Sequence, residues 1–199
     1  LEQNVFYHPV LRFQFATPTG WAYQNTPQVV QLASKDGKAM MMLTLAQGAS
    51  LQEAANAVLQ QYQLKPQESR EVTVNGLRAL AVVADLQQQQ GIIRTLSYFI
   101  QFGGNIYHLM GVSGLNDFNS YVPYFNTTMQ SFKELTDAAK INKKPQRVRI
   151  KTVNQSTTLE QALRSHGAPA ARLEEFAVLN GMELKDNVPA GTLIKVIAE

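Results

Sequence analysis

The alternation of apolar and polar residues over the first 115 positions constrains the fold of this chain more than any other feature. In Leu11–Phe15 every second side chain is apolar, and the stretch ends at Thr17-Pro18-Thr19-Gly20, a turn by composition. Asp36-Gly37 and Asn75-Gly76 lie between further apolar runs and are typical of hairpin turns. A period of two predicts an antiparallel meander, with strands at residues 11–15, 21–23, 29–32, 39–45, 71–74, 77–86, 91–102 and 106–112.

Two segments replace this alternation with a helical period. Ser50 and Glu53 form a capping box, and the apolar residues of 51–62 then fall on one helical face. Residues 117–135 repeat large apolar side chains at steps of four and three, with Pro123 in the first turns, where proline is tolerated. Helices on an antiparallel sheet make an α+β fold, and we assign residues 1–138 to it as one domain.

Residues 139–146 lack periodicity and predict a basic linker. The net charge of +3 lies entirely in residues 143–199, which hold nine basic and six acidic residues, whereas residues 1–142 hold nine of each. A basic run can serve an anionic partner. We favour a solvated linker and the exposed face of one strand, because alternate residues from Arg147 onward point to the same side.

Residues 147–199 predict a small β-α-α-β module. Its expected strands are 148–153 and 192–197. Its first expected helix runs from Leu159 to Ser165 and is broken by His166-Gly167-Ala168-Pro169, and its second ends at Leu179, before Asn180-Gly181. A unit of about 50 residues is near the lower limit for folding unaided, so it is expected to lean on its neighbour.

No catalytic motif is found along the chain. It contains no cysteine, and His8, His108 and His166 form neither H-E-x-x-H nor a pair four residues apart. We therefore assign no catalytic, cofactor-binding or metal-binding residue to this chain. An enzyme whose site is assembled from distant residues such as His108 and Asp85 stays open as a minor alternative. No apolar stretch of about 18 residues predicts a membrane span, and no interleaving of aromatic and basic residues predicts a nucleic-acid partner.

Trp21 and the three methionines Met40–Met42 each allow two interpretations. Trp21 is either a ligand platform or, as we favour, the anchor of a sheet edge. The methionines are either an adaptable binding surface or, as we favour for residues of a strand, partly core.

Two resemblances cover most of the chain. F-Q-F-A-T-P-T-G-W at 13–21, followed by strands, the Ser50 helix, more strands and a closing helix with Phe125, Met129 and Phe132, resembles the PsbP-like fold. Thr157-Thr158-Leu159, Leu179-Asn180-Gly181 and the segment 189–196 are similar to a lysin-motif (LysM) module. The G-D of that motif is replaced by Ser156-Thr157, and its leading aromatic residue is missing.

The LysM resemblance implies a glycan site in two loops. The candidate residues for binding a glycan or another partner are Asn154, Gln155, Ser156, Thr157, Asn180, Gly181 and Met182. The alternative is that this module only packs against the first domain.

The pairing of the two modules resembles the C-terminal region of bacterial secreted zinc metallopeptidases of the HtpX-like class. Tyr7-His8-Pro9, Lys140-Ile141-Asn142 and Arg147-Val148-Arg149-Ile150 carry this resemblance. It implies that a preceding, missing domain holds the zinc in an H-E-x-x-H motif, and that this chain is a non-catalytic accessory region in the periplasm or cell envelope. The implied partners are its own upstream peptidase domain, another envelope protein, and peptidoglycan. A stand-alone PsbP-like protein-binding module is the alternative.

Overall fold

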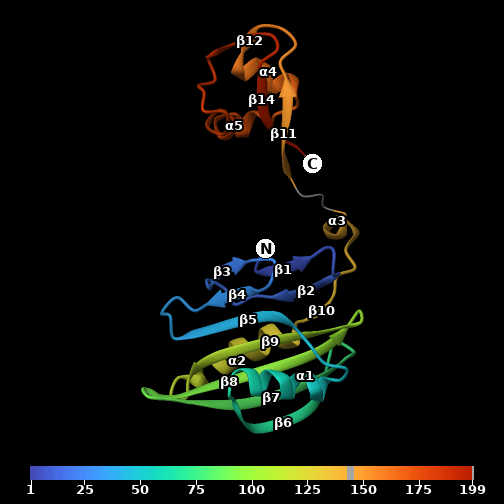
Figure 1. Ribbon diagram of the computed structural model, residues 1–199, viewed down its shortest axis with the longest axis vertical. Coiled ribbons are helices and arrows are strands. Elements are labelled where there is room, and N and C mark those ends of the chain that lie inside the picture. The colour runs from blue at the N-terminus through green and yellow to red at the C-terminus, as the bar shows by residue number, and fades with distance from the viewer. Residues whose placement is uncertain (143–145, 199) are drawn as a thin grey trace. The chain divides into compact units, whose positions relative to one another are not determined.

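The computed structural model describes residues 1–142 and 146–198 (Figure 1). The chain forms two compact units, Leu1–Asn142 and Lys143–Glu199, which we call unit 1 and unit 2. The division falls inside the segment predicted as a linker, 139–146. Helix α3 (Ala138–Ile141) occupies the start of that segment. Residues 143–145 of the predicted linker lie outside the described residues.

Unit 1 is built on a seven-stranded antiparallel sheet in the order β3-β4-β5-β9-β8-β7-β6. A second, three-stranded sheet has the order β1-β2-β10. The antiparallel α+β prediction is therefore confirmed. The strands of unit 1 are β1 (Val5–His8), β2 (Phe13–Ala16), β3 (Ala22–Asn25), β4 (Val30–Ala33), β5 (Ala39–Ala46), β6 (Lys65–Val74), β7 (Leu77–Gln88), β8 (Gly91–Phe102), β9 (Asn105–Gly114) and β10 (Lys133–Glu134).

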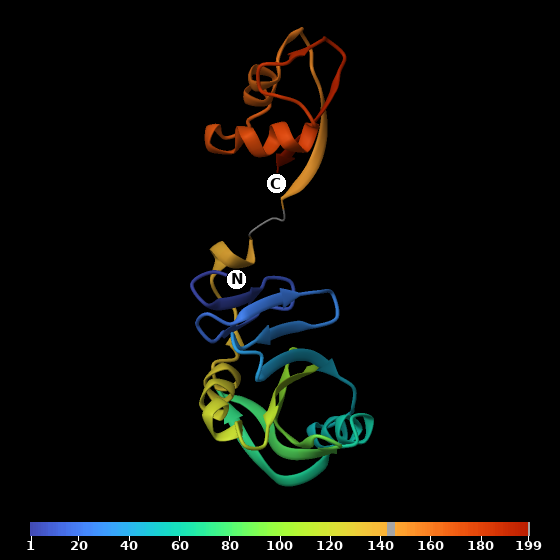
Figure 2. The same ribbon diagram turned by 90° about the vertical axis from the view of Figure 1, so that its left-hand side faces the viewer.

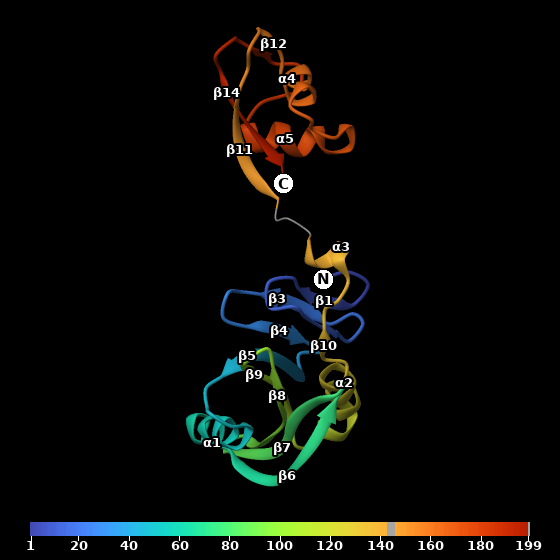
Figure 3. The same ribbon diagram turned by 90° about the vertical axis from the view of Figure 1, so that its right-hand side faces the viewer.

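The two long helices of unit 1 cover opposite faces of the large sheet, as Figures 2 and 3 show. Helix α1 (Leu51–Gln61) buries Ala54 and Val58 against the face that carries Phe99. Helix α2 (Phe118–Gln130) buries its apolar stripe against the other face, and β1 and β2 complete that core. Each helix thus buries the apolar face that its sequence period predicts.

The capping box of α1 is confirmed with one difference. The Ser50 hydroxyl oxygen accepts a hydrogen bond from the Glu53 backbone N–H at 3.1 Å. The Glu53 carboxylate accepts from the backbone N–H of Ala49 at 3.0 Å, one residue earlier than a reciprocal box predicts. The first bond satisfies a donor that the first helical turn leaves free, and the second ties the residue before the N-cap to that turn.

The predicted second helix, 117–135, is too long, because α2 ends at Gln130. Lys133–Glu134 instead form β10, which pairs with β2. The side-chain nitrogen of Asn75 donates to the carbonyl oxygens of Gln130 and Phe132 at 2.9 Å each. A side chain of the β6–β7 turn therefore hydrogen-bonds two carbonyls at the end of α2. The spacing of apolar residues along the helix cannot predict this long-range contact.

Unit 2 has the predicted β-α-α-β arrangement. Its outer strands, β11 (Arg147–Thr152) and β14 (Leu193–Ala198), pair antiparallel. Between them lie β12 (Thr157–Thr158), α4 (Leu159–Ser165), a short 3₁₀ turn (Ala170–Arg172), α5 (Leu173–Asn180) and β13 (Asn187–Val188). The core of unit 2 is separate from that of unit 1 and consists of Val153, Leu159, Ala162, Leu163, Leu173, Phe176, Ala177, Val188, Ile194 and Val196.

Candidate functional site

His108 and Asp85, the pair considered for an assembled catalytic site, do not converge. In the sheet register, Asp85 on β7 lies opposite Arg94 on β8, and Arg94 lies opposite Ser113 on β9. His108 is on β9 too, five residues before Ser113. Five strand residues span roughly 17 Å, and an odd separation places two side chains on opposite faces of a sheet. The two groups therefore cannot act on one substrate atom.

Each of these two groups has a structural contact instead. His108 stacks on Phe99 with ring centroids 4.5 Å apart, and its Nε2 lies 3.0 Å from the Ser97 hydroxyl. Burial lowers the pKa of His108 to about 4. The Arg94 guanidinium hydrogen-bonds both carboxylate oxygens of Asp85, at 2.7 and 2.8 Å, and holds the pKa of Asp85 below its usual value.

In residues 1–142 and 146–198, no group of three or more His, Asp or Glu side chains is arranged to hold a metal ion. No helix in the same part of the chain is long and apolar enough to cross a bilayer.

Strand β3 is one edge of the large sheet and is the best candidate for a binding surface in unit 1. Its four residues are exposed, and it pairs only with β4. The Thr26 N–H donates to the Val29 carbonyl. Because hydrogen-bonded pairs alternate along an antiparallel ladder, Gln24 and Ala22 also bond to β4. The backbone N–H and C=O groups of Tyr23 and Asn25 therefore point away from β4, toward the open edge.

An aromatic cluster lies where the chain enters β3. The Trp21 ring has its centroid 6.0 Å from that of Tyr124 and packs edge-on against Tyr121 and Phe125 of α2. Trp21 therefore packs the start of this edge strand against α2, in line with its interpretation as an anchor of the sheet edge. A groove of about 460 Å³ adjoins the cluster, with Pro18 and its neighbours on one side and Tyr124 and its neighbours on α2 on the other.

A second cleft lies where the chain leaves β3. Its volume is about 310 Å³ and its walls are mainly apolar, with Leu11, Leu45 and Tyr107 among the lining residues. His8 and Asn25 supply polar groups. The His8 Nδ1 accepts the Leu11 backbone N–H at 3.1 Å, which places the proton of the neutral ring on Nε2. Burial lowers the pKa of His8 and so favours this neutral form.

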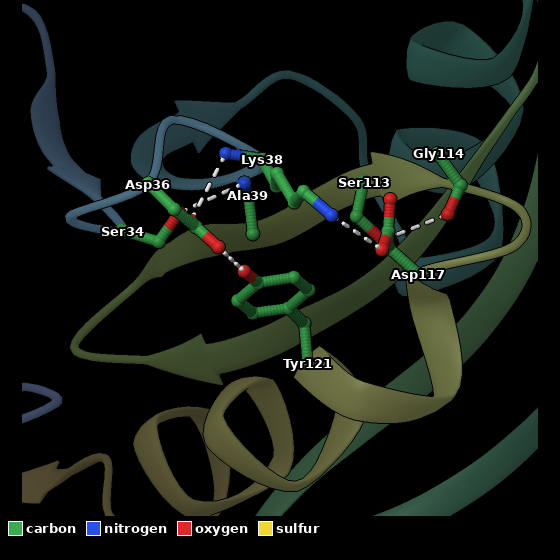
Figure 4. Close-up of polar contacts among 8 residues, drawn as sticks. All are labelled: Ser34, Asp36, Lys38, Ala39, Ser113, Gly114, Asp117 and Tyr121. Carbon is green, nitrogen blue, oxygen red and sulfur yellow. Dashed lines mark hydrogen bonds and ion pairs between the residues drawn. The ribbon is translucent and has the colours of Figure 1, made fainter.

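A polar cluster holds the β4–β5 turn against α2 near this edge (Figure 4). The Tyr121 hydroxyl donates to Asp36 at 2.5 Å, and the Ser34 hydroxyl donates to the other carboxylate oxygen at 2.7 Å. Lys38 forms an ion pair with Asp117 at 3.2 Å. The bond from Tyr121 is the main reason that the pKa of Asp36 falls to about 2. This cluster ties the β4–β5 turn, beside the edge strand, to α2.

In unit 2, the first candidate glycan-binding loop is residues 154–157. Two of its side chains have no hydrogen bond among those described, and two are hydrogen-bonded within the unit. Asn154 and Gln155 are exposed. The Ser156 hydroxyl oxygen accepts the Ala190 N–H at 3.0 Å, and the Thr157 hydroxyl donates to the side-chain oxygen of Gln161. The polar groups with most freedom to meet a ligand are therefore those of Asn154 and Gln155.

The second group of candidates is held by another segment of unit 2. The Asn180 side chain accepts the Lys195 N–H at 2.7 Å and donates to the Lys195 carbonyl at 2.8 Å. Gly181 ends α5 in the left-handed conformation, and Met182 packs against the core of unit 2. The first loop bonds to residues 188–190, so the two groups contact different segments.

The comparisons with known proteins support the fold and give no family. A scan against protein-family models finds no match, and neither does a search of curated proteins. The solution structure of CyanoP, the cyanobacterial PsbP of a Synechocystis species, matches with a TM-score of 0.53 and 11% identity over 65% of this chain and 91% of CyanoP. Unit 1 has a PsbP-like fold.

Two further solved structures are similar. A crystal structure from Bacteroides thetaiotaomicron has a TM-score of 0.52 and 11% identity, and it covers 100% of this chain and 87% of that chain. LpqN of Mycobacterium tuberculosis, described as involved in cell envelope biogenesis, has a TM-score of 0.45 and 7% identity, over 61% of this chain and 82% of that one. At 11% identity, the matches to CyanoP and to the Bacteroides structure bear on the fold alone.

The sequence points to Trp21 as a possible ligand platform, but it does not identify the β3 edge or the hollows where the chain enters and leaves β3 as a binding surface. Tyr23, Tyr124 and His8 lie far apart along the chain. They come near the same sheet edge only because β1, β3 and α2 pack beside one another. One signal was present: A-Y-Q-N at 22–25 contains no charge, which is unusual for an exposed edge strand.

Proposed function

We propose that this chain is a non-catalytic, partner-binding region of a cell-envelope zinc metallopeptidase. In this proposal, unit 1 holds an extended polypeptide along β3, and unit 2 attaches to peptidoglycan. The polypeptide is a substrate, the upstream peptidase domain of the same protein, or another envelope protein. The observation that carries the proposal is the open, uncharged edge at β3.

The two edges of the large sheet differ in a way that favours β3 as the binding edge. The other edge strand, β6, carries Lys65, Pro66, Glu68, Arg70 and Glu71. Charges and proline on an edge strand oppose the addition of another strand. Strand β3 has no such residue and presents two N–H groups and two C=O groups to a partner. Strand addition at such an edge is a common mode of peptide recognition.

The two hollows next to β3 supply sites for side chains of a bound strand. The groove beside Trp21 and Tyr124 offers aromatic and proline surfaces, which suit apolar or proline-containing segments. The cleft beside His8 and Leu45 offers apolar walls with a hydrogen-bond donor at the His8 ring. Backbone bonds would supply affinity, and these hollows would supply selectivity.

For unit 2 we propose a LysM-like role in attachment to peptidoglycan. The β-α-α-β arrangement and the exposed amides of Asn154 and Gln155 support this role. Polar side chains in a shallow loop are suited to sugar hydroxyls. The competing assignment is that unit 2 only packs against unit 1.

The zinc belongs, in this proposal, to a catalytic domain upstream of this chain. No residue of this chain is assigned to the metal. Attachment to peptidoglycan and the parent peptidase together place the protein in the periplasm or elsewhere in the cell envelope. The alternative, a stand-alone PsbP-like binding module, predicts the same surface at β3 but no peptidase.

The Asn25→Pro variant tests strand addition at β3. This change removes an N–H that points to the open edge and bonds nothing in the described chain, so β3 keeps its pairing with β4. We expect peptides selected from a displayed random library on the full chain to lose binding to Asn25→Pro and to keep binding to Gln24→Ala. Equal binding of all selected peptides to both variants would contradict the proposal.

Peptidoglycan attachment is tested by cosedimentation of the full chain with purified peptidoglycan. The double variant Asn154→Ala, Gln155→Ala should leave more protein in the supernatant, whereas Gln24→Ala in unit 1 should not. Equal retention of the double variant, or no sedimentation of the parent chain, would exclude the glycan role.

The parent gene tests the link to a peptidase. We expect an upstream H-E-x-x-H segment, and hydrolysis of a protein substrate by the whole protein that stops when zinc is chelated and returns when zinc is added. A gene without that segment would favour the stand-alone binding module.

A further inference from the structure

The cations of unit 2 divide into two groups. Away from the two-stranded sheet, every described cation forms an ion pair: Arg164 with Glu160, Arg172 with Glu175 and Lys185 with Glu183. On the sheet, Lys195 of β14 donates to the Leu179 carbonyl at 3.3 Å. The other three cations, Arg147, Arg149 and Lys151 of β11, form no ion pair within residues 146–198, and all three are exposed. Three of the four cations of this sheet therefore lie on one strand, β11, without an ion pair among the described residues.

These three cations lie in a row on one face. They alternate along β11, so their side chains point to the same side at intervals of roughly 7 Å. Arg149 lies opposite Val196 and Lys151 opposite Ile194 in the β11–β14 ladder. Val196 and Ile194 are buried in the core of unit 2. Because cross-strand partners share a face, the three cations lie on the same face of the two-stranded sheet as these core residues, at its border.

The other face of β11 is apolar and exposed. Val148 is 53% exposed and Ile150 56%, and on β14 Leu193, opposite Thr152, is 65% exposed. Strand β11 therefore presents charge on one side and apolar surface on the other, and Lys195 of β14, opposite Ile150, borders the apolar side.

The outer edge of β11 is also open. Val153 N–H donates to the Thr192 carbonyl, and by the alternation of the ladder Arg147, Arg149 and Lys151 bond to β14. The backbone groups of Val148, Ile150 and Thr152 therefore point outward. On β14, the Asn180 carboxamide occupies the equivalent outward groups of Lys195. The edge of β14 is thus blocked at its centre, and that of β11 is not.

We propose that β11 is a docking strand for an extended polypeptide in which acidic and apolar residues alternate. Acidic residues at positions i, i+2 and i+4 would face the three cations, and the apolar residues between them would cover Val148 and Ile150. The backbone of the partner would satisfy the outward N–H and C=O groups. This inference does not depend on the function proposed for unit 1.

Two other occupants fit less well. A polyanion such as polyphosphate neutralises the cations, but it offers no donor to the outward carbonyls and nothing to the apolar face. A second copy of β11 would bring two rows of cations onto the same face, and like charges directly opposite one another destabilise a strand pair.

Fluorescence anisotropy with the full chain and a labelled Glu-Val-Glu-Val-Glu-Val-Glu peptide tests this proposal. We expect saturable binding that weakens with added salt. Arg149→Glu should weaken binding by about tenfold or more, because it reverses the central charge of the row. The matched variant Lys185→Glu makes the same change of charge away from β11 and should change binding by less than about twofold.

Two further probes separate strand addition from simple charge attraction. Ile150→Pro removes an outward N–H that bonds nothing in the described chain, and it should abolish binding while the circular dichroism of the protein is unchanged. A peptide of the same composition with its Glu and Val residues in two blocks should bind at least about tenfold more weakly. The proposal is overturned if the block peptide or polyphosphate binds as tightly as the alternating peptide, if Arg149→Glu has no effect, or if sedimentation shows that β11 mediates a dimer.

Discussion

Phe125 of α2 lies directly over Gly111 of β9. A Cβ atom on residue 111 would be 2.6 Å from Cδ1 of the Phe125 ring, which is closer than carbon atoms can approach. The same ring packs edge-on against Trp21 at the start of β3. The absence of a side chain at Gly111 therefore sets how closely α2 approaches the sheet, and so positions the aromatic cluster beside the proposed binding edge.

Gly111→Ala should destabilise unit 1 by about 1–3 kcal/mol, because α2 must move away from β9. Urea unfolding followed by Trp fluorescence measures this, since Trp21 is the single tryptophan and lies in unit 1. Gly114→Ala is the control: a Cβ there would find its nearest neighbour 3.9 Å away, and we expect a change of less than about 1 kcal/mol. Equal effects of the two variants would show that the close contact at Gly111 is not limiting.

Asn180→Ala should destabilise unit 2. It removes the two hydrogen bonds to Lys195 and one to the Phe176 carbonyl, at a cost of about 1–3 kcal/mol. Native-state hydrogen exchange of the α5 amides, read by mass spectrometry, reports on unit 2 alone. Asn154→Ala is the matched control, and it should leave exchange in α5 unchanged because Asn154 is exposed.

His108 should make the stability of unit 1 depend on pH. Its folded pKa of about 4 lies below the ordinary histidine value of 6.5, so the unfolded chain binds more protons between these values. Stability is therefore complete above about pH 6.5 and falls as the pH drops toward 4, by roughly 2–3 kcal/mol at pH 4.5. His108→Gln should remove this component from urea unfolding at pH 7.5 and 4.5. An unchanged pH dependence in the variant would mean that His108 does not titrate in this range.

Asp36 should titrate well below ordinary aspartates. An NMR titration of its carboxyl carbon should give a pKa of about 2, so that its contribution to stability is present above pH 4 and is lost as the pH falls through about 2. Tyr121→Phe should raise this pKa, because the Tyr121 hydroxyl is its main hydrogen-bond donor. Tyr124→Phe, whose ring lies in the same aromatic cluster, should not.

The sequence predicts well those elements whose signals are local. Asn75 and Gly76 both adopt positive φ in the predicted two-residue turn, at 48° and 83°, and the hairpin of β6 and β7 forms around them. Gly181 ends α5 with φ of 64°, as its position after Asn180 predicts. Of the three methionines, Met41 is 2% exposed and belongs to the core, whereas Met40 is exposed.

The sequence predicts poorly those elements that depend on long-range pairing. Strand β6 begins at Lys65, six residues before the predicted start, because K-P-Q-E-S-R-E has no alternation of apolar residues and becomes a strand only by pairing with β7 along an edge. Strand β1 was also missed, since only its antiparallel pairing with β2 defines it.

The candidate site in unit 1 depends on the same kind of information. The outward direction of the Tyr23 and Asn25 backbone groups follows from the register of β3 on β4, and register cannot be read from four residues. The role of Asn180 was likewise hidden, because its partner Lys195 lies 15 residues away.

Amide hydrogen exchange at β3 tests the central claim most directly. The measurement compares the full chain alone with the full chain saturated by a peptide selected on it from the displayed library. We predict that the amides of Tyr23 and Asn25 exchange more slowly when the peptide is bound, while those of Ala22 and Gln24, already bonded to β4, change little. Protection confined to other parts of the chain, with Tyr23 and Asn25 unchanged, would contradict the account.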